Sequence, residues 1–171
     1  VMVTCDSAAM FLDQEPDPNR RKATKWVALA LKSRAALHAA SVAKFWDKNE
    51  FTGKAVDDGL VGMPKSAADK YYAHCIQACE EIIRSGYFSL YKANPANPDE
   101  ATENYRAMFE DPNIALEEVI FLKGFNEIGV GYGSNQDNWG NPNQTRGAWP
   151  HPGRFNPTLE LIDAYERYDN P

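Results

Sequence analysis

The chain has 171 residues, 43% of them hydrophobic and 25% charged, and its 24 acidic and 18 basic side chains give a net charge of −6. These values are typical of one globular domain and exclude a collagen, a coiled-coil rod and a wholly disordered chain. We expect no nucleic-acid partner, because neutralising phosphates needs a basic surface, and no stretch approaches the roughly 18 consecutive apolar residues of a membrane span.

Both ends suggest a segment of a longer protein. Val1 lies inside a helical pattern without an initiator methionine or signal-peptide features. At the other end, the chain stops directly after a helix-like run. The missing targeting signal is therefore uninformative about localisation. The three cysteines are too few for a disulfide framework.

Apolar periodicity predicts two helices in the first part of the chain. Residues 1–13 fit the end of a helix, which the prolines within residues 15–18 interrupt. A long, alanine-rich helix is predicted from its cap, Thr24, to about Trp46, and the alanines let a neighbouring helix approach closely. We expect Arg34 to form a buried structural ion pair on the apolar face of this helix. That face is predicted to contain Val27, Leu31, His38, Val42 and Phe45.

A second long helix is predicted from Ser66, with Asp69 as a variant capping box, to Gly86, where helices commonly end. The two helices are typical of a tetratricopeptide-like antiparallel hairpin, spanning residues 20–91. The connection between them is too long for a clean repeat, and no second copy is present. The apolar stripe of the second helix contains Tyr71, Tyr72, Cys75, Ile76, Cys79, Ile82 and Ile83.

Three further elements are predicted. A short helix is predicted over residues 99–110, and residues 118–122 are the segment of the chain with the strongest strand pattern. A last helix covers residues 157–168, with Asn156 as its cap and Pro157 at its first position. The predicted fold class is therefore mainly α, with long irregular loops and at most a minor β element, in a single segment 1–171. The buried side of the last helix is expected to contain Leu159, Ile162 and either Ala164 or Tyr165.

No pattern for catalysis or for a resident metal stands out. His74, Cys75 and Cys79 lack zinc-site spacing, and the cysteines are expected to act as small core residues. The sequence contains neither a Gly-x-Ser-x-Gly nor a His-Glu-x-x-His motif. We predict no enzymatic activity, no catalytic residue, no metal and no cofactor. Whether the protein binds calcium is left open by the sequence, because residues 135–143 carry oxygen ligands but lack the spacing of an EF-hand loop.

The strongest functional signal is the segment 126–156, predicted to be a long ligand-type loop. It holds six of the 11 glycines, six asparagines and two of the four tryptophans. Aromatic plates beside amides and a guanidinium suit a sugar, which offers a C–H face and hydroxyl groups. Composition favours equally the alternative that the tryptophans have a structural role and pack the loop against the helices. The predicted stacking platforms are Tyr132, Trp139 and Trp149, and the predicted hydroxyl partners are Asn135, Asn138 and Arg146.

Three motifs, in this order along the chain, resemble the SusD/RagB family of surface glycan-binding lipoproteins. The first is an alanine-rich helix with an embedded arginine, residues 25–41, KWVALALKSRAALHAAS. The second is the partner helix with its tail, residues 72–91, YAHCIQACEEIIRSGYFSLY. The third and most specific is residues 156–165, NPTLELIDAY. The resemblance covers nearly the whole chain but only a central part of the longer family proteins.

The resemblance implies a scaffold of tetratricopeptide-like hairpins whose loops bind glycan without chemistry. It also implies a location on the outer face of a Gram-negative outer membrane, through a lipid anchor outside this segment. The implied partner is a SusC-like TonB-dependent transporter, to which the glycan is delivered. The family motifs do not specify the six ligand positions in residues 126–156. The competing hypothesis is a helical-repeat protein-interaction module without a sugar ligand.

Overall fold

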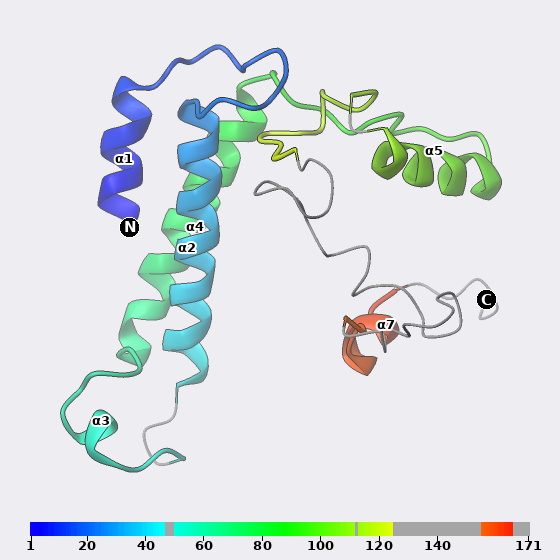
Figure 1. The fold of residues 1–171 in the computed structure, drawn as a ribbon. Helices are drawn as coiled ribbons and strands as arrows, with labels where there is room; N and C mark the ends of the chain where they lie inside the picture. Colours follow the sequence, from blue (N-terminus) through cyan, green and yellow to red (C-terminus); the bar gives the residue numbers. More distant parts are fainter. Residues whose placement is uncertain (47–49, 112, 125–154, 166–171) are drawn as a thin grey trace, which may run out of the picture. The chain divides into compact units, whose positions relative to one another are not determined.

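The computed structural model describes residues 1–46, 50–111, 113–124 and 155–165 of the chain. The chain divides into two compact units, residues 1–123 and 124–171. The described part is mainly helical and contains no strand, which confirms the predicted fold class (Figure 1). The tetratricopeptide-like detail stays a prediction. The helices are α1 (Met2–Phe11), α2 (Lys25–Phe45), α3 (Lys54–Asp57), the 3-10 turn η1 (Lys65–Ala67), α4 (Ala68–Arg84), α5 (Pro98–Glu110) and α7 (Leu159–Asp163).

Helix α2 is the centre of the first unit and packs against both α1 and α4 (Figure 1). It runs antiparallel to α4. An ion pair of 2.6 Å joins Lys25 Nζ at the start of α2 to Glu81 Oε1 near the end of α4. At the opposite end of the pair, Lys44 Nζ lies 5.7 Å from the centre of the Tyr72 ring. The predicted antiparallel pair of helices is therefore present.

Alanines make this close packing possible. Ala36, Ala40 and Ala43 of α2 are fully buried, and Ala78 of α4 is nearly so. Small side chains let the helix backbones approach and gain dispersion contacts. The larger core residues gather toward the start of α2, where Trp26, Leu29 and Ile82 are buried together with Ala9, Ala30, Phe88 and Ile120 packed against them.

The structure corrects the predicted orientation of α2. The face expected to be buried is the outer one, since Leu31 is 55% exposed, Phe45 is 72% exposed, and Arg34 and His38 are exposed as well. Both neighbouring helices pack on the alanine side, because that side permits the closest approach. The expected buried ion pair of Arg34 is therefore wrong. The buried cation is Lys32, whose Nζ lies 2.6 Å from Asp6 Oδ1 on α1.

The predicted strand 118–122 is also wrong. The chain over residues 113–118 forms consecutive turns, and residues 119–124 are irregular. Among the described residues no strand pairs with this segment, and its backbone makes isolated hydrogen bonds instead of a ladder. The Leu122 N–H donates to the Arg20 carbonyl over 2.6 Å, and the Ser89 N–H donates to the Glu117 carbonyl over 3.0 Å.

The last helix is shorter than predicted. Helix α7 begins at Leu159, and the Thr158 hydroxyl accepts from the Leu161 N–H over 3.3 Å. Thr158 is therefore the cap where Asn156 was expected. The helix ends at Asp163, and residues 166–168 of the predicted helix lie outside the described part. The side expected to be buried is instead exposed at Leu159, Ile162 and Tyr165 and also at Ala164.

The other helix ends follow local rules. Helix α4 begins at Ala68, after the turn η1, two residues beyond the predicted cap Ser66. Beyond its last turn Gly86 has a φ of +72°, in the left-handed region that glycine adopts without strain. No helix among the described residues is long and apolar enough to cross a membrane.

Helix α5 begins with a side-chain cap, which gives a local prediction. The Asn97 side chain accepts from the Glu100 N–H over 2.9 Å, and Pro98 occupies the first helical position. We expect Asn97→Ala to destabilise α5 by about 1 kcal/mol and to speed hydrogen exchange of its first amides. The control is Asn94→Ala, an exposed position before the cap. Equal exchange rates in the two variants would show that the cap contributes nothing.

Candidate functional site

The six predicted ligand residues lie in residues 125–154, outside the part of the chain that the structure describes. The structure therefore neither brings them together nor separates them. They are Tyr132, Asn135, Asn138, Trp139, Arg146 and Trp149. The first unit nevertheless contains two clefts with aromatic walls.

One cleft lies beside α5 and encloses about 250 Å³. Tyr91 and Tyr105 give it aromatic walls, and Lys92, Asn104 and Glu118 are its polar residues. Glu118 is engaged in holding the chain, since its Oε2 accepts from the Tyr91 N–H over 2.8 Å. Apolar walls with a few convergent polar groups are typical of small-ligand sites.

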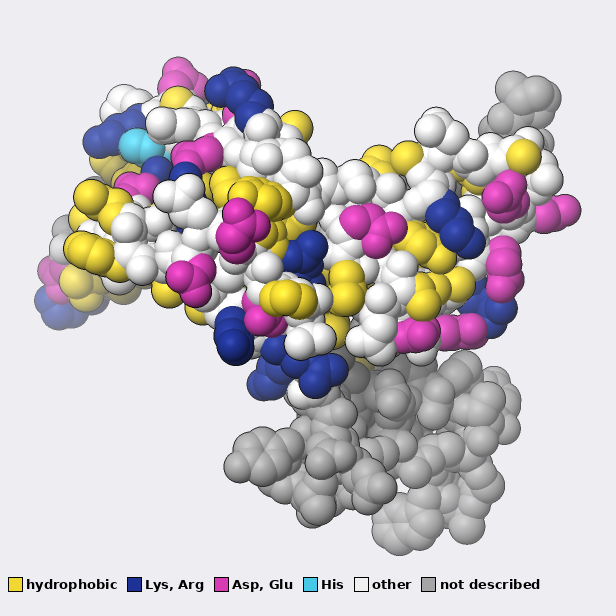
Figure 2. Space-filling view, turned by 90° about the horizontal axis from the view of Figure 1, so that it is seen from above, with side chains coloured by type: hydrophobic (Ala, Val, Ile, Leu, Met, Phe, Trp, Pro, Cys, Tyr) yellow, Lys and Arg dark blue, Asp and Glu magenta, His cyan; other side chains and the backbone are white. Residues whose placement is uncertain are grey.

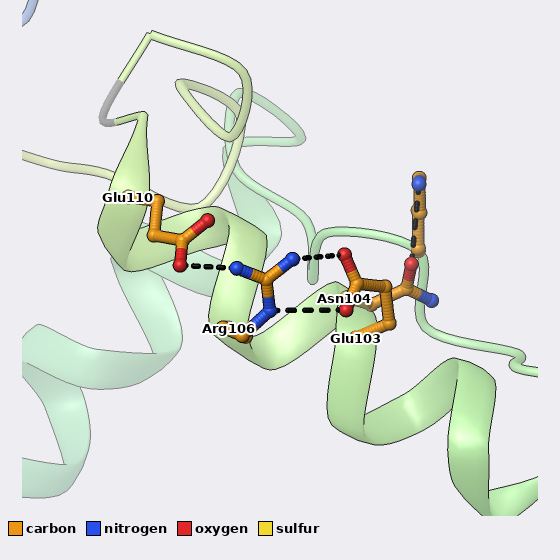
Figure 3. Close-up of polar contacts among 5 residues, drawn as sticks. Glu103, Asn104, Arg106 and Glu110 are labelled. Atoms are coloured by element: carbon orange, nitrogen blue, oxygen red, sulfur yellow. Dashed lines mark hydrogen bonds and ion pairs between the residues drawn. The ribbon is translucent and has the colours of Figure 1, made fainter.

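Asn104 is the unusual residue of this cleft. Asn104 is only 7% exposed, and its Oδ1 accepts from Lys92 Nζ over 3.1 Å (Figure 3). Its Nδ2 is buried without a hydrogen-bond partner among the described residues. Lys92 has a φ of +44°, a left-handed backbone that costs a non-glycine residue about 1–3 kcal/mol. Strained backbone positions cluster at functional sites, and a buried amide without a hydrogen-bond partner needs an explanation.

Sequence reasoning missed this cleft. An asparagine inside a helix gives no sign of burial, and a left-handed lysine has no residue signature. Both features arise because the tail after α4 folds back beside α5. Tyr105 and Met108 carried a usable signal, as apolar residues of the predicted helix 99–110.

On the exposed side of α5, Arg106 is held between two carboxylates (Figure 3). Its Nε and Nη2 donate to the two carboxylate oxygens of Glu103 over 3.0 and 2.6 Å, and its Nη1 donates to Glu110. The hydrogen bonds from Arg106 lower the pKa of the Glu103 carboxyl, and the same contacts raise the pKa of Arg106. Because both donor edges of the guanidinium are occupied, Arg106 has a structural role on the helix surface.

The Arg106 contact predicts a pH dependence. The pKa of Glu103 is lower in the folded state, so the bond stabilises α5 above the ordinary glutamate pKa and is lost as the pH falls through the lowered value. We expect carboxyl NMR titration to place the pKa of Glu103 below that of an unpaired glutamate. Arg106→Gln is expected to raise that pKa. An unchanged pKa in this variant would contradict the assigned cause.

The second cleft encloses about 480 Å³ at the end of the α2–α4 pair. The Trp46 and Phe51 rings stack with centroids 4.9 Å apart and an interplanar angle of 7°. Gly62, with a φ of +82°, lies so close to the indole that a Cβ there would be 2.1 Å from Trp46 Cε2. The indole is thus fixed against the backbone. The other lining residues are mostly apolar, namely Val56, Gly59, Val61, Met63, Pro64 and Lys65.

The cysteines and His74 form no metal site in the described part, where no three His, Cys, Asp or Glu side chains are grouped to hold an ion. Burial raises the pKa of the Cys75 thiol, and the neighbouring Cys79 raises it further. A raised pKa keeps the thiol protonated at neutral pH and so makes it a weak nucleophile and metal ligand. All three cysteines are free thiols.

Comparison with protein-family models, with curated proteins and with solved structures gave no match for this chain.

Proposed function

We propose that this chain is the central, glycan-binding segment of a SusD-like outer-membrane lipoprotein. It binds oligo- or polysaccharide without chemistry and passes it to a SusC-like TonB-dependent transporter at the cell surface. The membrane is reached only through a lipid anchor outside this segment. The observation that carries the proposal is the order of the three family motifs, with the tryptophan- and asparagine-rich segment 126–156 directly before the third.

The described fold is compatible with this proposal. The first motif, residues 25–41, lies on α2, and most of the second, residues 72–91, lies on α4. These two helices pack together, which supports the helical hairpin that the resemblance implies. The third motif contains α7. The same scaffold would support other ligands, so the proposal depends on the sugar-binding chemistry of segment 126–156.

The test is the loss of glycan binding on removing the predicted stacking platforms. We expect Trp139→Ala combined with Trp149→Ala to weaken binding by about 1–3 kcal/mol, or roughly 5- to 150-fold, because each indole contributes a stacking face. Binding is measured by calorimetry against a panel of plant, bacterial and host oligosaccharides. Melting temperatures by circular dichroism are expected to change little.

The matched control is Phe11→Ala, which removes an exposed aromatic ring of α1 outside segment 126–156 and outside both clefts. It is expected to leave glycan affinity unchanged. Absence of binding to every glycan of the panel would contradict the proposal. A collapse of stability with unchanged affinity would instead assign a purely structural role to Trp139 and Trp149.

One structural observation favours the second candidate function, a helical-repeat protein-interaction module without a sugar ligand. Figure 2 shows apolar side chains exposed between charges of both signs on one face of the molecule. Large apolar residues are exposed along both central helices, and patches of this kind mark interaction surfaces when they are contiguous. They are Leu31, Leu37 and Phe45 of α2 and Ile76 and Ile83 of α4.

A further inference from the structure

The cleft beside α5 (the α5 cleft) has the size and the walls of a site for a compact organic molecule. Its volume of about 250 Å³ lies just below the range of about 300–1,000 Å³ that drug-sized ligands occupy. Few of its side chains could pair with the many hydroxyl groups of a sugar, so a mainly apolar ligand suits it better. The apolar wall residues are Leu90, Ala93, Pro95, Ala101 and Met108.

Asn104 in the wall of the α5 cleft needs a hydrogen-bond acceptor. The ammonium group of Lys92 donates to its Oδ1 over 3.1 Å, which assigns the other end of the amide, Nδ2, as a donor (Figure 3). Nδ2 is buried and has no partner among the described residues. Burying a donor without a partner is destabilising. An acceptor that enters the cleft would therefore gain a hydrogen bond that the described fold does not supply.

The charges of the α5 cleft favour an anionic acceptor. Lys92 is its cationic residue, and within the described part its ammonium group is bonded to the neutral amide of Asn104. Glu118 is its acidic residue, and Oε2 of that side chain already accepts from the Tyr91 N–H over 2.8 Å. A carboxylate that accepts from both Nδ2 and Lys92 Nζ would form charge-assisted hydrogen bonds, which are stronger than neutral ones.

The wall of the α5 cleft can admit such a group. Because Nδ2 is buried, an acceptor reaches it only when a neighbouring wall side chain moves. Leu90 and Tyr105 are 68% and 61% exposed, so few contacts hold them in place. Asn104 itself lies in the middle of α5, whose backbone hydrogen bonds fix its position.

We propose that the α5 cleft binds a small carboxylic acid with an apolar or aromatic body. The carboxylate accepts from Asn104 Nδ2 and Lys92 Nζ, and the body lies against the apolar wall. The site shares no residue with segment 126–156, so the proposal goes beyond glycan binding and does not depend on it.

The experiment follows the side-chain amide signal of Asn104 in nitrogen-15 NMR spectra of the whole chain. The loss of this signal in Asn104→Leu identifies it. The probe is 3-phenylpropanoate, and the comparison compounds are 3-phenylpropanamide and 3-phenylpropylamine. The acid is expected to shift the signal downfield, and the neutral amide to bind at least about tenfold more weakly, because it lacks the charge. The amine is expected not to bind.

Two variants test the assigned contacts. Lys92→Met and Asn104→Leu are each expected to weaken binding of the acid at least about tenfold. The matched control Lys70→Met removes an exposed cation of α4 outside the cleft and should leave the affinity unchanged. Asn104→Leu is expected to keep its melting temperature, because it replaces an unpaired buried amide by an apolar group of similar size.

Four results would each overturn the proposal. The first is an Asn104 signal that the acid leaves unchanged, and the second is equal affinity for the acid and the amide. The third is full binding by Lys92→Met. The fourth is a signal that shifts with glucose and not with the acid, which would assign the cleft to a sugar. None of these results bears on glycan binding by segment 126–156, which the tryptophan variants test separately.

Discussion

Replacing Trp26 with alanine is expected to lower the free energy of unfolding by about 3–5 kcal/mol. Trp26 is 5% exposed and packs with Leu29 and Ile82 in the core. Its ring also meets Tyr87 and Phe88, with centroid distances of 5.5 and 6.2 Å. Removing the indole leaves a cavity where α2, α4 and the tail after α4 meet. Because small domains are stable by only about 5–15 kcal/mol, this loss is large enough to unfold much of the protein.

A second substitution separates the packing of Trp26 from its hydrogen bond. The indole Nε1 donates to the Gln14 carbonyl over 2.5 Å, which ties the α1–α2 connection to the core. Trp26→Phe keeps most of the packing but loses this donor, and it is expected to cost about 1–2 kcal/mol. Urea unfolding followed by far-ultraviolet circular dichroism measures both variants. A loss below about 1 kcal/mol for Trp26→Ala would show that the core does not depend on this residue.

Asp6→Ala is expected to destabilise the protein by about 1–3 kcal/mol, because it leaves the buried ammonium group of Lys32 without its carboxylate. The Lys32 side chain is only 8% exposed, and its Nζ lies 2.6 Å from Asp6 Oδ1. Asp6 itself is half exposed, so water reaches the contact and the loss stays below that of a fully buried pair. The pair joins α1 to α2, and its loss is expected to loosen α1 in particular.

The test of this pair is a double-mutant cycle. Lys32→Met keeps the apolar stem and removes the charge, so its own cost is expected to be small. In the Lys32→Met background, Asp6→Ala is expected to cost less than about 0.5 kcal/mol. Urea unfolding of the four proteins gives the coupling energy. An equal cost of Asp6→Ala in both backgrounds would mean that the two side chains do not interact.

The location of the helices could be predicted from local sequence. Apolar periodicity placed α2 and α4, and the predicted long helix from Thr24 to Trp46 matches α2 to within a residue. Gly86 marked the end of α4, and residues 99–110 fall within α5. These features depend on neighbours three or four residues away, which the sequence displays directly.

The candidate site could be predicted only in part. The composition of segment 126–156 predicts a ligand-binding loop, but its six proposed ligand residues lie outside the described part. The α5 cleft has no such signature, because it depends on a left-handed Lys92 and a buried Asn104. Both depend on contacts between segments that are separate in the sequence.

The sequence by itself determined the mainly α class and the positions of the long helices, because hydrogen bonding and capping within a helix are local. Only the tertiary structure decided which face of α2 is buried. Both faces are apolar, and periodicity favours the one with the larger side chains. The alanine face is buried instead, because small residues let α1 and α4 approach the same helix closely. That choice buried Lys32 and exposed Arg34.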